Sequence, residues 1–174
     1  MYRFNQELVK KMLTTRIPRW DDLPNFEVSN EQVISIVEQT LEDLAADGDQ
    51  VITKRMINNY VKWERLPKPK KKKYKRVHVA CCMVMSILKP VLSSRAIYKG
   101  IEMQTRLMGN QGAYDAFCEA LEAAIKATFA PIYNEKEPYV WEGFEANASD
   151  IAINSICRSL CYKIITDMAL RQEV

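Results

Sequence analysis

Residues 56–76, MINNYVKWERLPKPKKKKYKR, place a dense run of positive charge directly after an amphipathic segment. Seven of the nine positions from Lys68 to Arg76 are Lys or Arg, and prolines stand at 67 and 69. Such a run cannot enter a core, because burying unpaired charges is costly. It must therefore lie on the surface as a loop between helices, and the remaining segments must pack without it.

The positive charge of the chain is concentrated in this region. Residues 54–76 hold 11 basic residues and one acidic residue, a net of +10, whereas the other 151 residues hold 14 basic and 21 acidic residues, a net of −7. The formal net charge of +3 hides this uneven distribution. A basic island on an otherwise acidic protein favours a polyanionic partner.

Helical periodicity dominates the rest of the chain, and no stretch shows the alternation typical of strands. Ser29 and Gln32 have capping-box spacing, Thr53 can cap a second helix that Leu66-Pro67 ends, and Ser93 or Ser94 can cap a later one. The sequence therefore predicts an all-α fold in which the lysine segment is a loop that connects two helices. Its expected parts are an arm (1–28, pinned by Trp20, Leu23 and Phe26), a helical module (29–108), and a C-terminal helical hairpin (109–174) after a turn at Gly109–Gly112.

The hairpin is expected to contain a helix through Phe129 that Pro131 stops, and a final helix from about Ser149. The final helix is apolar nearly all round, which suits either a buried partner or a homodimer interface. The loop between them, residues 131–148, carries Tyr133, Tyr139, Trp141 and Phe144. Two interpretations of this loop remain open: it seals the core, or it lines a pocket for a small-molecule effector.

The helix capped by Thr53 is expected to bury Ile57, Tyr60, Val61 and in part Trp63. Its other face is basic and rich in amides, and the lysine loop follows it. Asn can make paired hydrogen bonds to adenine in the major groove, while Lys and Arg neutralise phosphates. The predicted DNA-binding residues are Lys54, Arg55, Asn58, Asn59, Lys62, Lys68, Lys70, Lys71, Lys72, Lys73, Tyr74, Lys75 and Arg76. For Tyr74, packing of the loop onto the next helix is the alternative to a phosphate contact.

The stretch ITKRMINNYVKWERLPKPKKKKYKRVHV resembles the MerR-type winged helix-turn-helix. By that resemblance, residues 53–65 form the recognition helix, Leu66-Pro67 opens the wing and Tyr74 closes it, and LSSRAIYKGI matches the fourth helix. The strings MINNYVKW, LPKPKKKKY and VMSILKPVLS are more closely similar to the bacterial uncharacterised-domain family 1836, over residues 15–110. The named member of that family is a transcriptional regulator. The resemblance thus implies a MerR-like winged helix-turn-helix that binds double-stranded DNA.

Other functional classes have little support in the sequence. There is no Gly-rich phosphate loop, no nucleophile with a base at readable spacing, and one histidine, so no catalytic residues and no enzyme are expected. The five cysteines lack a CxxC pair, so no metal and no cofactor are expected, and the thiols are interpreted as core residues of a cytoplasmic protein. No apolar run is long enough for a membrane span. The alternative function is a protein-interaction module whose basic loop docks on an acidic partner or an anionic surface.

Overall fold

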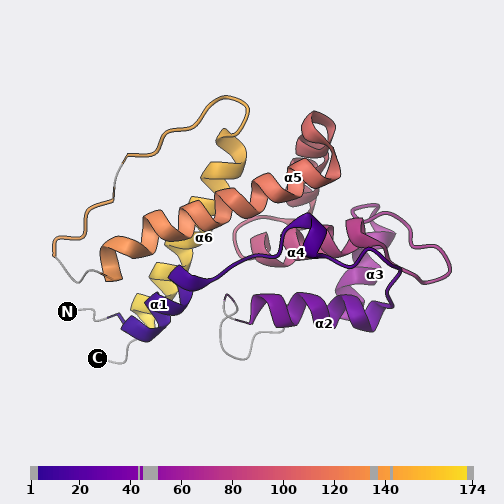
Figure 1. Cartoon of the computed structure of the whole chain (residues 1–174), viewed down its shortest axis with the longest axis horizontal. Coiled ribbons are helices and arrows are strands. Elements are labelled where there is room, and N and C mark those ends of the chain that lie inside the picture. The colour runs from indigo at the N-terminus through magenta and orange to yellow at the C-terminus, as the bar shows by residue number, and fades with distance from the viewer. Residues whose placement is uncertain (1–3, 43, 45–50, 134–136, 142, 172–174) are drawn as a thin grey trace. The chain divides into compact units, whose positions relative to one another are not determined.

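A computed structural model describes residues 4–42, 44, 51–133, 137–141 and 143–171 (Figure 1). The described residues form helices and two isolated β-bridges, without a strand. The predicted all-α class is therefore confirmed. The elements are α1 (Gln6–Thr14), the 3₁₀ helix η1 (Trp20–Asp22), α2 (Asn30–Leu41), α3 (Lys54–Lys62), α4 (Arg76–Leu88), α5 (Ser94–Tyr133) and α6 (Ile151–Leu170).

The chain divides into two compact units. Unit 1 comprises residues 1–16 and 119–174, and unit 2 comprises residues 17–118. None of the described helices is long and apolar enough to cross a membrane.

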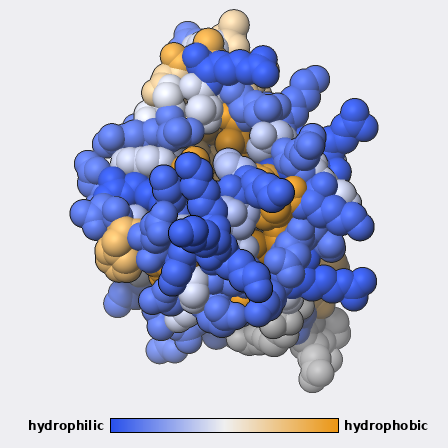
Figure 2. Space-filling model, turned by 90° about the vertical axis from the view of Figure 1, so that its right-hand side faces the viewer, coloured by the Kyte–Doolittle hydropathy of each residue, from blue (hydrophilic) through white to orange (hydrophobic). Residues whose placement is uncertain are grey.

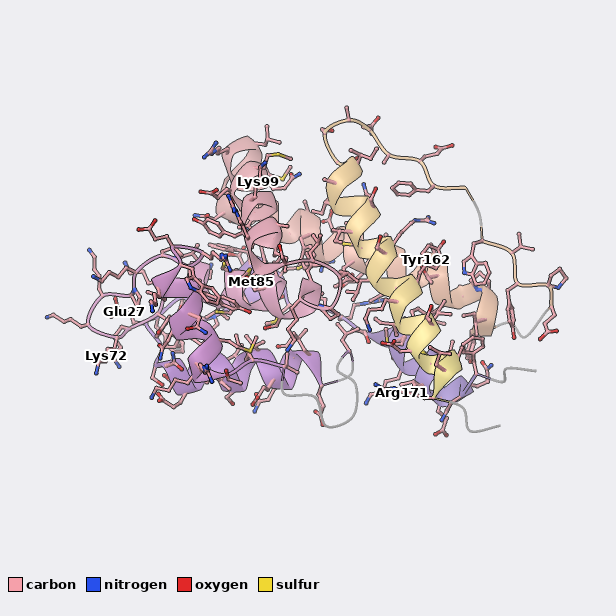
Figure 3. All side chains as sticks on the ribbon, turned by 180° about the vertical axis from the view of Figure 1, so that it is seen from behind. Glu27, Lys72, Met85, Lys99, Tyr162 and Arg171 are labelled. Atoms are coloured by element: carbon pink, nitrogen blue, oxygen red, sulfur yellow. The ribbon has the colours of Figure 1, made fainter. Side chains whose placement is uncertain are left out.

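Helix α4 is the centre of unit 2. Every residue from His78 to Leu88 is buried, including Cys81, Cys82 and Met85. Figure 3 labels Met85 on this helix. Such all-round burial requires an apolar sequence, and VHVACCMVMSIL supplies one. Helix α2 packs against both α3 and α4. A segment that is apolar on most faces predicts a helix at the centre of its module, and the burial of α4 agrees with that prediction.

Helix α2 begins as its sequence predicts. The Ser29 hydroxyl accepts from the Gln32 amide, and the Gln32 side chain accepts from the Ser29 amide, which completes a capping box. Val33, Val37 and Leu41 form its buried face. The helical spacing of its apolar residues predicts a helix that ends at Gly48, and this end lies outside the described residues, because residues 43 and 45–50 are not described.

Helix α5 corrects two expectations. Ser93 caps it, with its hydroxyl accepting from the Ala96 amide, but the expected turn over Gly109–Gly112 is a break at Gly109 alone, with φ +74°. The helix resumes at once because only this one residue needs the left-handed conformation that glycine allows. Pro131 does not stop the helix either, which runs on to Tyr133.

Unit 1 contains α1, the later part of α5, and α6. The helical spacing of Phe4, Leu8 and Met12 predicts a short amphipathic segment. Helix α1 buries Met12 together with Val9, whereas Leu8 is exposed. In α6, only Cys157, Leu160 and Cys161 are buried, and Ile151 and Leu170 are exposed. A helix apolar on most sides therefore packs in this chain along one side only.

The aromatic loop of unit 1 packs against the helices. The Trp141 Nε1 donates to the Thr128 carbonyl at 2.9 Å, and the Trp141 ring makes an edge contact with Tyr162 of α6. Tyr139 contacts both Trp141 and Phe4. These contacts favour the core-sealing interpretation of the loop.

Candidate nucleic-acid interface

Helix α3 separates its apolar and polar residues cleanly. The Thr53 hydroxyl accepts from the Met56 amide at 3.0 Å and starts the helix, as the sequence predicts. Ile57 and Tyr60 are buried, whereas Val61 is only half-buried. The opposite side, which carries Lys54, Arg55, Asn58 and Lys62, is exposed, and Asn59 is half-buried at its edge. The helix therefore presents three cations and an amide to solvent.

The end of α3 lies before the predicted Leu66-Pro67 stop. The Arg65 amide donates to the Tyr60 carbonyl, and the Glu64 amide donates to the Val61 carbonyl. This is the Schellman pattern, in which the residue after the C-cap takes a left-handed conformation. Here that residue is Glu64, with φ +57°, where glycine is usual. The backbone at the end of α3 is therefore strained, because Glu64 has a side chain at a position that favours glycine.

Trp63 differs from its predicted position. The indole is 50% exposed rather than packed inward, because the helix ends at Lys62 and the chain turns away. The Arg65 guanidinium lies 4.7 Å from the centre of the Trp63 ring. Arg65 also donates from Nη1 to the Ser94 hydroxyl of α5. Arg65 therefore joins the end of α3 to the start of α5.

The lysine loop contains a tight turn of four lysines. The Lys73 amide donates to the Lys70 carbonyl at 2.8 Å, and the two residues form an antiparallel bridge. Lys71 and Lys72 between them have φ values of +47° and +59°. Two positive φ values at the central positions define a type I′ turn, which normally takes Asn or Gly. Together with Glu64, these two lysines are all the positive-φ residues other than glycine in the described part of the chain.

Tyr74 anchors the C-terminal side of this turn. Its backbone exchanges two hydrogen bonds of 2.9 Å with Val28, and its hydroxyl accepts from the Asn30 Nδ2 at 3.0 Å. The ring is 4% exposed and makes an edge contact with His78. This placement favours the packing role for Tyr74 over a phosphate contact.

The single histidine of the chain lies beside this anchor. The His78 Nδ1 accepts from the Lys75 amide at 2.8 Å, at the first turn of α4. The side chain is buried, and this burial lowers its pKa below the usual 6.5. His78 is therefore neutral at pH 7 and supports the start of the helix, which is the structural role that a single histidine on a largely apolar helix predicts.

Arg76 is engaged with η1. Its Nη1 lies 3.1 Å from the Asp21 carboxylate, and its guanidinium lies 5.7 Å from the Trp20 ring. The same carboxylate accepts from Gln111 of α5 at 3.3 Å, and the Trp20 amide donates to Asp115 at 2.7 Å. The η1 residues therefore join the base of the lysine loop to α5 within unit 2.

Arm residues near this surface are only partly pinned. Leu23 is buried as expected, but Phe26 is 63% exposed, so its predicted packing role is wrong. Phe26 lies in the bend before the Val28 pairing, which directs its side chain away from the core. No local pattern in the sequence predicts the pairing of Val28 with Tyr74.

The comparisons with known proteins give one match. Residues 18–117 match the family described as Domain of unknown function (DUF1836). The chain belongs to this family. No curated protein and no solved structure matches the chain.

The DUF1836 region coincides with unit 2, residues 17–118. Helices α2, α3 and α4 and the lysine loop all lie inside the matched residues. The basic face of α3 and the lysine loop are therefore part of the region that defines the family.

The predicted site residues in the DUF1836 region are buried, half-buried or exposed. Tyr74 is buried, and Asn59 and Arg76 are half-buried. Lys54 pairs with Glu31 of α2 at 3.0 Å, which lowers the pKa of Glu31 to about 2, and both side chains stay largely exposed. The exposed members are Lys54, Arg55, Asn58, Lys62, Lys68, Lys70, Lys71, Lys72, Lys73 and Lys75.

The figures show how this surface is presented. Figure 3 shows Lys72 at the outer end of its loop, with Glu27 at the same end of unit 2. Figure 2 views the side toward which the loop extends, and this face is mostly hydrophilic with small, separate apolar areas. A surface of this kind suits a charged, hydrated partner better than an apolar one.

The rest of the described chain offers few groups for chemistry. No three His, Cys, Asp or Glu side chains gather as a metal site among the described residues. All five cysteines are buried, as predicted, and burial raises the pKa of Cys81 and of Cys161 to about 12. Such thiols are protonated at neutral pH and are poor nucleophiles.

Proposed function

We propose that the DUF1836 region of this chain is a winged helix-turn-helix that binds double-stranded DNA and regulates transcription. In this proposal α3 is the recognition helix, the loop from Pro67 to Arg76 is the wing, and the fold is MerR-like. A pair of such chains, joined through the C-terminal helices, would read two half-sites.

One observation carries the proposal. The outer face of α3 and the wing turn at residues 70–73 both present Lys or Arg to solvent, and both belong to unit 2. Neither segment has an acidic residue at an exposed position. The wing turn presents its lysines at a conformational cost, because Lys71 and Lys72 hold the left-handed geometry that other residues adopt more readily. Strained residues of this kind occur most often at functional sites.

The two segments have different roles in the proposal. The wing lysines are point charges, which neutralise phosphates and release counterions without regard to sequence. Asn58, which is exposed on α3, has a planar amide that can bond paired donor and acceptor atoms on a base edge. Affinity is therefore expected to come chiefly from the wing and sequence preference from the helix.

The test is fluorescence anisotropy of the full chain with a pool of random duplexes, titrated across salt, followed by sequencing of the bound fraction. Neutralising about six phosphates predicts a slope of log K against log salt of about −5. An enriched sequence motif would support a sequence-specific regulator. Salt-sensitive binding without enrichment would overturn the regulator and leave a basic docking surface for an acidic protein or anionic membrane.

A further inference from the structure

Helices α2 and α4 begin with the same hydrogen bond, made by different side chains. At the start of α2, the Gln32 side chain accepts from the Ser29 amide at 2.8 Å. At the start of α4, the His78 Nδ1 accepts from the Lys75 amide, also at 2.8 Å and over the same spacing. The amide of Gln does not titrate, whereas an imidazole gains a proton near pH 6.5. Of these two bonds, the one at the start of α4 can therefore be broken by a proton.

His78 lies between the two ends of the lysine loop. Nδ1 bonds to Lys75 at the C-terminal end, and the imidazole makes an edge contact with the buried ring of Tyr74, with 5.5 Å between the ring centres. Nε2 is buried close to the backbone of Pro67, which opens the loop, without a well-formed hydrogen bond in the described part of the chain. Tyr74 in turn pairs with Val28 ahead of α2. A change at this imidazole therefore acts on the loop where it begins and where it ends.

Protonation of Nδ1 would remove the acceptor of the bond to the loop. Nδ1 accepts only through a free lone pair, so an imidazolium would set a second N–H against the Lys75 N–H at 2.8 Å. It would also place a positive charge on a side chain that is 4% exposed, and burying an unpaired charge is costly. An imidazolium is therefore stable only when the ring and the end of the loop separate and both become hydrated.

The groups around His78 do not favour an imidazolium. Burial is the main cause of the lowered pKa of His78, and the positive charge of Lys75 lowers it further, while a hydrogen bond to the loop backbone opposes the shift without reversing it. On α4, Arg76 is paired with Asp21 of η1, and burial raises the pKa of the Cys82 thiol, which stays neutral. From α2, the side chain that reaches the neighbouring tyrosine is a neutral amide. The closed loop therefore disfavours the proton, and an open loop does not.

We propose that His78 is a pH sensor of the lysine loop: the neutral imidazole holds the loop closed on α4, and the protonated imidazole releases it. The open loop keeps its lysines but loses their fixed arrangement relative to α3. Under the proposed function, acid then weakens binding to DNA, whereas added positive charge by itself would strengthen it. Only this effect on DNA rests on the proposed function; the release of the loop does not.

The first measurement is hydrogen exchange of backbone amides, followed by NMR on the full chain from about pH 7.5 to about pH 5. The Val28 and Tyr74 amides, which bond to each other's carbonyls, report the closed loop, and the Met85 amide within α4 reports unit 2 as a whole. Below about pH 6.5, the protection of Val28 and Tyr74 should fall by up to about tenfold per pH unit, after correction for intrinsic exchange. It should stay below the protection of Met85, because the loop opens without the unfolding of α4.

His78→Gln is the matched control. Gln at this position can accept from the Lys75 amide, as Gln32 does at the start of α2, and it does not titrate. The variant should keep the helical circular dichroism, and its protection at Val28 and Tyr74 should not depend on pH. If the variant fails to fold, the unchanged chain still supplies a test, because its loss of protection should level off at the pKa of the single imidazole, read by NMR.

Fluorescence anisotropy with duplex DNA measures the effect on binding separately. Between the higher and the lower pH, the affinity of the unchanged chain should fall at least about twofold relative to the change that His78→Gln shows, which corresponds to about half of the loops being open. The comparison with the variant removes the effect of every other group that titrates in this range.

Each outcome decides one part of the proposal. Protection that does not change with pH, or a loss that His78→Gln shares, would overturn the sensor. Equal protection of Tyr74 and Met85 in acid would also overturn it, because acid would then unfold unit 2 rather than release the loop. Loss of loop protection with unchanged DNA affinity would overturn the control of DNA binding and leave the binding itself. Absence of DNA binding at the higher pH would overturn the proposed function, and the exchange data alone would then decide on the sensor.

Discussion

The Tyr74 hydroxyl accepts a hydrogen bond from the Asn30 Nδ2 at 3.0 Å, at a buried position between the lysine loop and the start of α2. The backbone of Tyr74 is paired at the same point with Val28, which stands two residues before Asn30. The lysine loop, which carries the most charge, is therefore held in place by the side chains of Tyr74 and Asn30 and by the backbone of Val28.

Tyr74→Phe should destabilise unit 2 by about 1–2 kcal/mol, because the Asn30 amide would keep its buried position but lose its acceptor. Urea unfolding measures the change. Tyr133→Phe, at an exposed hydroxyl, should have little effect. The affinity for DNA should stay the same after Tyr74→Phe, and a weaker affinity would instead assign the hydroxyl to a phosphate.

Replacing Lys71 by Asn and Lys72 by Gly should raise the free energy of unfolding by about 1–2 kcal/mol, since these residues suit a type I′ turn. The same change should weaken DNA binding and make the salt slope shallower by about two units, because two cations are lost. Lys71→Gln with Lys72→Gln is the matched control, which removes the charges and keeps the strain. Equal stability of the two variants would contradict the strained turn.

Glu64→Gly should stabilise the chain by about 1 kcal/mol, because glycine takes the left-handed conformation at the end of α3 without steric conflict. Thermal unfolding with Glu64→Gln as the control separates this effect from the loss of charge. Both variants should bind DNA more tightly than the unchanged chain, since each removes an acidic residue that directly follows the basic helix α3. A stabilisation shared by Glu64→Gln would assign the effect to charge.

Asn58→Ala should flatten the preference between an enriched duplex and a shuffled one, at a cost of about 1–3 kcal/mol on the enriched duplex alone. Lys71→Ala with Lys72→Ala should weaken both duplexes alike. Competition anisotropy on the two duplexes measures both variants. Equal losses on both duplexes after Asn58→Ala would exclude a base contact by this amide.

Lowering the pH through 6.5 should destabilise the chain, because the folded state holds the pKa of His78 below 6.5 while the unfolded state binds a proton near that value. Above 6.5 both states are neutral at this residue, and its contribution is constant. The imidazole NMR signals of the single histidine report the pKa without ambiguity. The free energy of unfolding should fall by at most about 1.4 kcal/mol per pH unit through this residue, and this contribution should be absent in His78→Gln.

Local sequence signals predicted the helices well. Ser29, Thr53 and Ser93 cap the helices expected of them because capping depends on residues three or four positions apart. The basic face of α3 was likewise predictable, since helical spacing alone decides which residues share a side.

The lysine loop and its neighbours were less predictable because distant contacts determine them. No Gly or Asn marks Lys71 and Lys72 as a turn, and the turn exists because Tyr74 pairs with Val28 far earlier in the chain. Trp63 is exposed because the Schellman ending, which lacks its usual glycine, turns the chain after Lys62. In contrast, the two glycines at 109 and 112 suggested a longer interruption than the one residue that departs from helical geometry.

The strained lysine turn also has a consequence for laboratory evolution of this protein. A selection for heat resistance alone would favour Asn or Gly at positions 71 and 72, because each relieves the left-handed backbone. Under the proposed function, the variants enriched by such a selection would bind DNA more weakly. Selections for a more thermostable variant therefore need to include a DNA-binding step, because heat treatment alone will enrich a well-folded protein that binds DNA weakly.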